Sequence, residues 1–280
     1  QQLDKQPRTT EGVYWHKAIY AYQVWLDGIF MGLPFRVKTA HMLPAKKQKA
    51  IYDDAVDQLT KTYERTLDAS TGLNRHAWDE NRAMFWSNDI TGLSQHCWGR
   101  AQGWYVMALV EILDALPEDY ARRGEVSDLL TRTLDGVVKW QDKDSGVWWQ
   151  VMDQPGREGN YLESTCSAMM AYSMLKGVRK GYIDGRFMEP ARKAYQGIVD
   201  RFLKVNPDMT LSLTDCCAVA GLGPGVSPAV SKAAPKVKEN RRRDGSFDYY
   251  ISEPVRDNDA KGVGPFVWAS LEMEQNGCAT

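Results

Sequence analysis

One carboxylate stands out because its neighbours in the sequence are apolar or aromatic. Asp27 lies in the segment 14–35, which reads YWHKAIYAYQVWLDGIFMGLPF. An acid in such surroundings is costly unless it is paired or used in catalysis. Aspartate is also common at helix starts, so a structural role is the alternative. The nearby His16, Lys17 and Trp25 offer a cation, a donor and a ring, which is more than a helix start requires.

A second cluster of residues able to bind a ligand lies in the segment WGRAQGW at 98–104. Arg100 and Trp104 stand four residues apart, so on a helix they share one face. An arginine at a helix start can hold a ligand carboxylate through two parallel hydrogen bonds. The alternative is a buried arginine that pairs with an acid of the protein. With Trp98 and Asp27, these residues predict a pocket for a small anionic ring.

Two further acids are candidates for a catalytic role. Asp79 stands in HAWDE and Glu163 in GNYLEST, and their structural alternatives are turn closure and the charge of a helix N-terminus. The segment KGVGPF at 261–266 places glycines before an expected helix, where backbone N–H groups would be open to an anion. Taken alone, this last pattern is weak evidence of a site.

No metal or other cofactor is predicted. His16 and His76 are two of only four histidines and lie far apart, without an HExxH or HxH spacing. The five cysteines form no CxxC pair. Free cysteines behave mostly as small buried hydrophobic residues, so the adjacent Cys216 and Cys217 are expected in the core.

The composition predicts one large domain over residues 1–280. The chain has 280 residues, of which 43% are hydrophobic, enough for a sizeable core. Its net charge of −1 predicts no nucleic-acid or membrane surface, and no apolar run reaches the about 18 residues of a membrane span. We expect a monomer or a weak homo-oligomer. Because the chain starts at Gln1, we expect that a leader or a longer segment was removed, and a cytoplasmic or a periplasmic location stays open.

Helical periodicity dominates the elements that must position these residues. In 45–66 the apolar residues Ile51, Ala55, Leu59 and Tyr63 recur every four residues. Residues 100–115 are apolar on most faces, which predicts a deeply buried helix that ends before Pro117. Further helices are expected at 122–141, 161–182, 188–205 and 263–275, with another beginning near Val24.

A short pattern recurs between these helices. LDASTGLNRHAWD at 67–79 returns as QDKDSGVWWQVMD at 141–153, and RDGSFDYYISE at 243–253 is a looser third copy. Each copy predicts a turn followed by a short extended aromatic piece. Repeated helix pairs that carry similar loops on one side predict a closed or curved array of helical hairpins. The loops would form one face, where function usually lies.

Residues 223–243 differ in composition from the rest of the chain. They contain three prolines and a basic run that ends in Arg241–Arg243. We predict a surface insertion, because such charge runs usually stay solvated. Contact with an anionic polymer is the alternative.

The motifs match a known family. The chain resembles the unsaturated rhamnogalacturonyl hydrolases of glycoside hydrolase family 105, relatives of the unsaturated glucuronyl hydrolases. The resemblance runs from near residue 12 to the C-terminus, and its WLDG and WGRA motifs are the most specific. The segments that carry it are YWHKAIYAYQVWLDGIFMGLPF, HAWDE, CWGRAQGWYVMALVEILDALP, GVWWQVMD, GNYLESTCSAMMAYSMLKGVRKGYI, CAVAGLG, RDGSFDYYISEP and KGVGPFVWASLEME.

The resemblance implies an all-α fold, the (α/α)6 barrel, which is a toroid of helical hairpins. It also implies removal of a 4,5-unsaturated uronic acid from the non-reducing end of lyase-generated oligosaccharides of the rhamnogalacturonan or pectin type. By motif position, Asp27 is the catalytic residue. The substrate-binding residues that it implies are His16, Lys17, Trp25, His76, Trp98, Arg100 and Trp104.

Two features depart from the family pattern. The family has a further N-terminal stretch of several helices with another active-site aspartate, for which this chain has no counterpart. The resemblance therefore implies a barrel that lacks its first helices. The second departure is 223–243, where the family has a short link.

The expected chemistry needs one acid. Asp27 would protonate C4 of the C4=C5 double bond, and the ionised carboxylate would then draw a proton from the water that attacks C5. Arg100, His16 and Lys17 would orient the carboxylate and hydroxyls of the substrate.

The indoles of Trp98 and Trp104 are expected to stack on the sugar ring. A general acid also needs a pKa above that of an ordinary aspartate at neutral pH. We expect burial beside Trp25 and Phe30, or a neighbouring acid, to raise the pKa of Asp27 more than the helix start and nearby cations lower it.

Two other functions stay open. One is a carbohydrate-binding or regulatory helical toroid that has lost catalysis. The other is a glycosidase for saturated sugars, which would place Glu163 or Asp79 across the pocket from Asp27.

Overall fold

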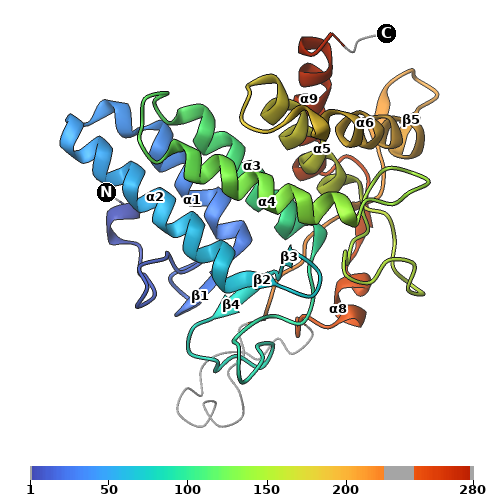
Figure 1. Ribbon diagram of the computed structural model, residues 1–280. Helices are drawn as coiled ribbons and strands as arrows, with labels where there is room; N and C mark the ends of the chain where they lie inside the picture. Colours follow the sequence, from blue (N-terminus) through green and yellow to red (C-terminus); the bar gives the residue numbers. More distant parts are fainter. Residues whose placement is uncertain (1, 224–242, 278–280) are drawn as a thin grey trace.

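Helices dominate the computed structural model, which describes residues 2–223 and 243–277 (Figure 1). Four of them, each packed on the next, form an arc in the order α1 (Leu26–Lys38), α3 (Gly99–Ala115), α5 (Ser164–Arg179) and α9 (Ala260–Gln275). The other long helices, α2 (Ala45–Thr66), α4 (Arg123–Lys139) and α6 (Met188–Phe202), each pack on the arc helix that precedes them. This arrangement confirms the predicted all-α array of helical hairpins.

The long helices begin and end close to the predicted positions. The predicted helix 45–66 coincides with α2, and α3 begins one residue before the predicted start. The first helix begins at Leu26 rather than near Val24, because Gln23–Trp25 form the strand β1. The fifth begins at Ser164 rather than at 161, because Glu163 is its N-cap and accepts from Cys166 N.

The last helix starts earlier than predicted, and this corrects the anion site proposed for KGVGPF. Helix α9 begins at Ala260 because the carboxylate of Asp259 accepts from Lys261 N at 3.0 Å. Gly262 therefore lies inside the first turn, where a Cβ would stand 2.8 Å from Cys216 Sγ. Its small size permits close packing of α9, and the helix start is already capped by an acid.

Short antiparallel strand pairs and single helical turns fill the connections. The pairs are β1 (Gln23–Trp25) with β4 (Ala77–Asp79), β2 (Leu67–Asp68) with β3 (Leu73–Asn74), β5 (Leu203–Val205) with β6 (Leu211–Leu213), and β7 (Cys216–Cys217) with β8 (Val255–Arg256). The 3-10 turns are η1 (Leu3–Lys5), η2 (Ala40–Met42) and η3 (Gly185–Phe187), and a short helix α8 covers Phe247–Ser252.

The repeated turn is present in the first two copies. Asp68 accepts from Ser70 N at 3.0 Å, and Asp142 accepts from Ser145 N at 2.8 Å. Gly72 and Gly146 follow with φ of 74° and 76°, a conformation that favours glycine.

The third copy of the turn differs from the prediction. Asp244 does accept from Ser246 N at 2.9 Å, but the aromatic piece that follows forms α8 instead of an extended strand. The side chain of Ser246 caps this helix by accepting from Tyr249 N at 3.1 Å.

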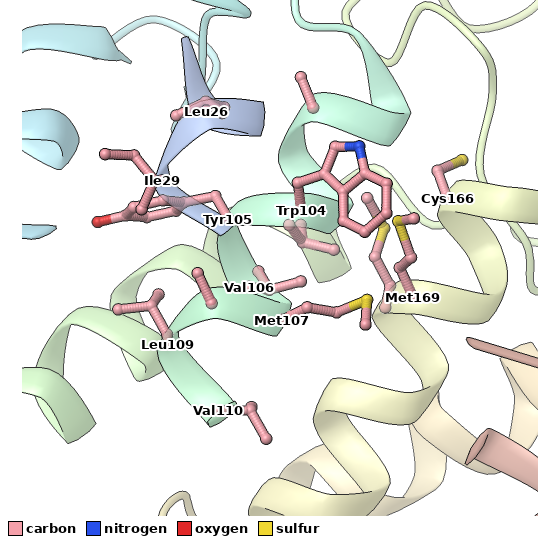
Figure 2. Packing of buried hydrophobic residues seen from close by; sticks show 14 of the residues in the cluster. Leu26, Ile29, Trp104, Tyr105, Val106, Met107, Leu109, Val110, Cys166 and Met169 are labelled. Carbon is pink, nitrogen blue, oxygen red and sulfur yellow. The ribbon is translucent and has the colours of Figure 1, made fainter. Parts of the chain in front are cut away.

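The core fills the space between neighbouring arc helices and the space between these and α2, α4 and α6. Every residue of α3 from Gly99 to Leu113 is buried, as the apolar sequence predicted. Figure 2 shows side chains of α1, α3 and α5, among them Ile29, Tyr105 and Met169, filling this space. Cys216 and Cys217 are also fully buried and unoxidised, which confirms their predicted place in the core.

A buried ionic network joins three arc helices near their C-terminal ends. Glu111 on α3 accepts from Lys176 Nζ of α5 at 2.8 Å, from Tyr172 of the same helix, and from Lys38 of α1. Lys176 also lies 3.1 Å from Asp114. Glu111 and Lys176 are only 6% and 7% exposed, so removing one of them would leave a buried charge without its main partner.

The arc is open between its two end helices in the described part of the chain. Helices α1 and α9 lie apart in Figure 1. Each has apolar side chains that are exposed to solvent. Phe35 is 65% exposed on α1, and Trp268 is 42% exposed on α9. Within the described residues no helix combines the length and hydropathy that a membrane span requires.

The predicted insertion lies almost entirely outside the described residues. Its two flanks meet, because Gly223 N donates to Arg243 O at 2.8 Å. The surface insertion at 223–243 stays a prediction.

Candidate active site

The pair of strands β1 and β4 brings Asp27 and His76 together. Trp25 pairs with Ala77 in antiparallel register, so the residues after Trp25 face those before Ala77. Leu26 N donates to His76 O at 3.2 Å, which ties the start of α1 to this loop. His76 Nε2 consequently lies 3.1 Å from Asp27 Oδ2.

Asp27 occupies the first turn of α1 and stays accessible to a ligand. Its side chain is 14% exposed, whereas that of His76 is fully buried. The ring N–H of His76 does not point straight at the oxygen, so the contact is a close polar approach rather than an aligned hydrogen bond. The carboxylate therefore has one protein partner on its inner side and an opening on the other.

Stacked rings flank the carboxylate. The His16 ring lies parallel to Trp25 with centroids 4.3 Å apart, and Tyr20 stacks on Trp25 at 4.9 Å. The edge of Trp25 meets His76 at 5.3 Å. Lys17 is exposed on the same loop, with Nζ 5.7 Å from the Tyr20 ring centroid.

The glycine of the WLDG motif permits the close approach of His16. A Cβ at Gly28 would stand 2.8 Å from His16 Nδ1 and 3.1 Å from its Cα. His16 N also donates to Gln23 O at 2.8 Å, which closes the loop onto β1. Gly28 is thus required by packing, and its place next to Asp27 brings His16 against the first turn of α1.

Arg100 is buried at the start of α3 with part of its guanidinium unused. It is 1% exposed, and Nη2 lies 3.1 Å from Thr165 Oγ1, 3.4 Å from Glu163 Oε1 and close to Cys217 O. Its Nε and Nη1 have no hydrogen-bond partner among the described residues. The predicted pairing with an acid is present, and the two nitrogens without a partner are themselves buried.

The two predicted stacking platforms are less accessible than expected. Trp98 is 1% exposed and Trp104 is 8% exposed. Trp98 lies between His76, at 4.8 Å, and Tyr250, at 6.0 Å, and Trp104 packs on Phe30 at 4.7 Å. The structure therefore makes both indoles part of the wall that supports the site, because protein rings already cover them.

The other two acids have structural partners. Asp79 is 1% exposed and accepts from the backbone N–H groups of Ala83 and Met84 at 2.7 and 2.8 Å, which closes its turn. Glu163 is fully buried and accepts from Cys166 N and Cys217 N at 2.7 and 2.9 Å. Both match the structural alternatives that their sequence positions offered.

The expected direction of the Asp27 pKa is wrong. Burial does raise the pKa of Asp27, but the contact with His76 and the charge of His16 lower it more, and the net pKa lies below the ordinary value. Burial lowers the pKa of His16 to about 4, despite the opposing effect of Asp27. At neutral pH the site without substrate therefore holds an ionised Asp27 beside a neutral His16.

The helices that carry Asp27 and Arg100 start in the same way. Trp25 is the N-cap of α1 and Trp98 is the N-cap of α3, and neither helix has a side-chain cap. By contrast, carboxylates cap α5 and α9. The first N–H groups of α1 and α3 thus add positive potential beside the site.

Sequence reasoning missed two buried residues of the wall. Tyr250 of α8 is fully buried, and its hydroxyl lies 2.7 Å from His76 Nδ1. Gln150 accepts from Trp98 Nε1 at 3.1 Å and donates to Tyr250 O at 3.3 Å. The third turn copy contained Tyr250, but no local pattern indicates a contact across 174 positions.

A metal centre has no ligand set in the part of the chain that is described. No group of three or more His, Cys, Asp or Glu side chains stands close enough to hold an ion there.

A family model described as Glycosyl Hydrolase Family 88 matches residues 1–276. A 24.9 kDa protein in the picA locus of Rhizobium radiobacter is 36% identical over 246 residues, which cover 86% of this chain and 97% of that protein. The unsaturated rhamnogalacturonyl hydrolase YesR of Bacillus subtilis is 27% identical over 178 residues, 62% of this chain and 48% of that enzyme.

Among solved structures, a family 105 glycoside hydrolase of C. acetobutylicum is 42% identical, with a TM-score of 0.89. The match covers 98% of this chain and 71% of that one. The structural neighbours from families 88 and 105 have an (α/α)6 toroid fold. This confirms the predicted fold and the resemblance to family 105.

Proposed function

The chain belongs to Glycosyl Hydrolase Family 88, and from this membership we propose that it removes a 4,5-unsaturated uronic acid from the non-reducing end of lyase-generated oligosaccharides. A glycosidase activity follows from the family. The substrate type that we propose is rhamnogalacturonan or pectin, supported by the likeness to the B. subtilis enzyme.

The observation that carries this proposal is that, of the three candidate acids, Asp27 alone stays accessible. Asp27 keeps an exposed edge in a wall of rings, whereas Asp79 and Glu163 are consumed by backbone N–H groups. Hydrolysis of a saturated glycoside ordinarily uses two carboxylates on opposite sides of the bond. Hydration of an enol ether needs one group that first gives and then takes a proton, which Asp27 can do.

In the first step, the Asp27 carboxyl gives its proton to C4 as the C4=C5 π bond breaks. Positive charge develops at C5 and is shared with the ring oxygen. In the second step, water forms a bond to C5 and the ionised Asp27 takes the released proton. The resulting hemiketal opens to a ketone at C5, and the hemiacetal left at C1 collapses and releases the remaining sugar.

Binding of the substrate makes Asp27 take up from solvent the proton that the free site lacks. The uronate carries its own carboxylate, and a like charge near Asp27 raises the pKa of that group. We assign the two unpartnered donors of Arg100 to the substrate carboxylate, with His16 and the exposed Lys17 on the hydroxyl side. Fixed orientation of the ring over Asp27 then favours protonation at C4.

The test supplies unsaturated disaccharides from lyase-digested rhamnogalacturonan and follows the absorbance of the conjugated double bond. We expect the absorbance to fall and, in D2O, one deuterium to appear at C4. Asp27→Asn should lower kcat by about 10²- to 10⁴-fold with the helix content unchanged. Asp208→Asn, at an exposed turn, serves as the matched control and should keep full activity.

Each result has a defined reading. Full turnover by Asp27→Asn would show that another group moves the proton. Binding of the disaccharide by the wild-type protein without loss of the double bond would instead identify a carbohydrate-binding protein. Cleavage of saturated uronides at a similar rate would contradict the enol-ether mechanism.

A further inference from the structure

A buried chain of polar contacts runs inward from the catalytic carboxylate. Asp27 Oδ2 lies 3.1 Å from His76 Nε2, and His76 Nδ1 lies 2.7 Å from the Tyr250 hydroxyl. His76 and Tyr250 are both fully buried. The three residues come from α1, the loop before β4, and α8, so the fold brings them together from distant parts of the sequence.

The direction of these contacts follows from their chemistry. A neutral imidazole has one N–H and one acceptor nitrogen. A lone pair on Nε2 would face the ionised oxygen of Asp27 at 3.1 Å, so the N–H must be on Nε2. Nδ1 is then the acceptor, and the Tyr250 hydroxyl is the donor that it needs.

Tyr250 is well suited to donate. Burial raises the pKa of the Tyr250 phenol well above its ordinary value, with smaller contributions in the same direction from Tyr249, Asp27, Cys97 and Asp153. The hydroxyl therefore keeps its proton throughout the working pH range. At the other end of these contacts, Asp27 is also influenced by the nearby His16.

The Tyr250 ring is also held rigidly. It stacks on Trp98 with an interplanar angle of 24°, and its carbonyl accepts from Gln150 Nε2 at 3.3 Å. Gln150 in turn accepts from Trp98 Nε1 at 3.1 Å. The hydroxyl thus contacts His76 from a fixed position. A residue that orients a functional side chain must itself be held in place by packing and hydrogen bonds.

We propose that Tyr250 is a positioning residue that fixes His76 as its Nε2–H tautomer and keeps that N–H, rather than a lone pair, beside Asp27. In this role the tyrosine never touches the substrate. It keeps the imidazole from turning its acceptor nitrogen toward the carboxylate and so maintains the one inner contact of the proton donor. This inference rests on the proposed function, because it concerns the group that moves the proton.

The decisive measurement does not need turnover. With ¹⁵N-labelled histidine, the chain gives signals from only four residues, which substitution of each can assign. We expect the His76 signals to report a protonated Nε2 and an unprotonated Nδ1 at neutral pH. Tyr250→Phe should abolish this single tautomer, lower kcat about 3- to 10-fold with a smaller change in KM, and shift a limb of the pH profile of kcat.

Tyr249→Phe is the matched control. Tyr249 lies next in the same short helix, is 4% exposed, and its hydroxyl accepts from Gly221 N at 2.9 Å instead of contacting His76. Removal of the Tyr249 hydroxyl should leave the His76 signals and the pH profile of kcat unchanged.

A proton on Nδ1 of His76 in the wild-type protein would overturn the proposal, even if Tyr250→Phe failed to fold. So would a Tyr250→Phe variant with wild-type His76 signals. A protein that shows the expected tautomer and its loss but does not consume unsaturated uronides would keep the contact and refute the proposed function instead.

Discussion

At the scale of residues, the site depends on two opposite effects on the pKa of Asp27. Burial favours its neutral form, and the neighbouring imidazoles favour its ionised form. In the free protein the effect of the imidazoles is stronger, so the pKa of Asp27 lies below its ordinary value. In the proposed mechanism Asp27 therefore takes its proton from solvent when the substrate binds, because the substrate carboxylate raises the pKa of Asp27.

Proton uptake on binding is the measurable result. The ligand is a disaccharide in which the C4=C5 bond is reduced. Its binding should take up a fraction of a proton that approaches one at a pH between the lowered pKa of free Asp27 and its higher pKa in the complex. Calorimetry in two buffers of different ionisation enthalpy measures this number.

Asp27→Asn is the control for this uptake. The pKa of His16, about 4 in the free protein, also rises near a bound anion, so the variant measures that contribution alone. Equal uptake by the wild-type protein and the variant would mean that the ligand carboxylate does not act on Asp27.

Residue types alone predicted part of this site. The apolar context of Asp27 indicated a special carboxylate, and the structure places His16, Trp25 and His76 around it. The sign of its pKa was not predictable, because it depends on a 3.1 Å contact with a residue 49 positions away. Tyr250 was not predictable for the same reason, since only the folded chain brings it to His76.

At the scale of elements, the strand pair β1–β4 and the first turn of α1 form one unit. The register of the strands places His76 against Asp27, and Gly28 lets His16 lie on the same turn. The long helices were predictable from their apolar periodicity and ended within a few residues of the predicted bounds. The short strands were not, because two or three residues carry too little pattern, and the cap at Ser246 overrode the expected extended form of α8.

Gly28→Ala should damage this unit. The new Cβ meets His16 Nδ1 at 2.8 Å, and the backbone contact at 3.1 Å leaves little room for the histidine to give way. We expect kcat/KM to fall about 10- to 100-fold and the free energy of unfolding to drop by about 1 to 3 kcal/mol. Steady-state kinetics and urea unfolding measure the two effects.

Gly124→Ala is the comparison for Gly28→Ala. Gly124 stands in the first turn of α4 with nothing within 4 Å of a Cβ, so alanine there should be neutral or stabilise by up to about 1 kcal/mol. Wild-type kinetics in Gly28→Ala would show that His16 is not held against this turn.

At the scale of the whole molecule, the two ends of the arc helices have different tasks. Their N-terminal ends hold Asp27, Arg100 and the caps of α5 and α9, whereas the network around Glu111 ties α1, α3 and α5 together near the other end. Stability and chemistry are therefore separable by mutation.

Glu111→Gln should destabilise the fold while sparing the site. It leaves Lys176 buried with only Asp114 as an acidic partner, so we expect the free energy of unfolding to fall by about 3 kcal/mol at pH 7. Burial raises the pKa of Glu111, but its lysine contacts lower it more, to below the ordinary value. The stabilisation by ionised Glu111 is thus fully present above the ordinary carboxyl range. The difference in free energy of unfolding between wild type and Glu111→Gln should become smaller as the pH falls through the lowered pKa of Glu111.

Asp135→Asn is the control for Glu111→Gln, because it breaks an ion pair that is exposed to solvent. Its pair with Arg186 is about half exposed, at 45% and 56%, and should change stability by less than about 1 kcal/mol. A loss of kcat in Glu111→Gln at a temperature where it is fully folded would contradict the separation of the two ends.

The contact between His76 and Tyr250 also has a consequence for how the chain acquires its native state. It joins positions 174 residues apart, whereas the helical hairpins close over short distances along the chain. Contacts of high sequence separation carry the larger loop-closure entropy and tend to form after local ones. A newly made chain would thus gain its helices before the contact between His76 and Tyr250 forms.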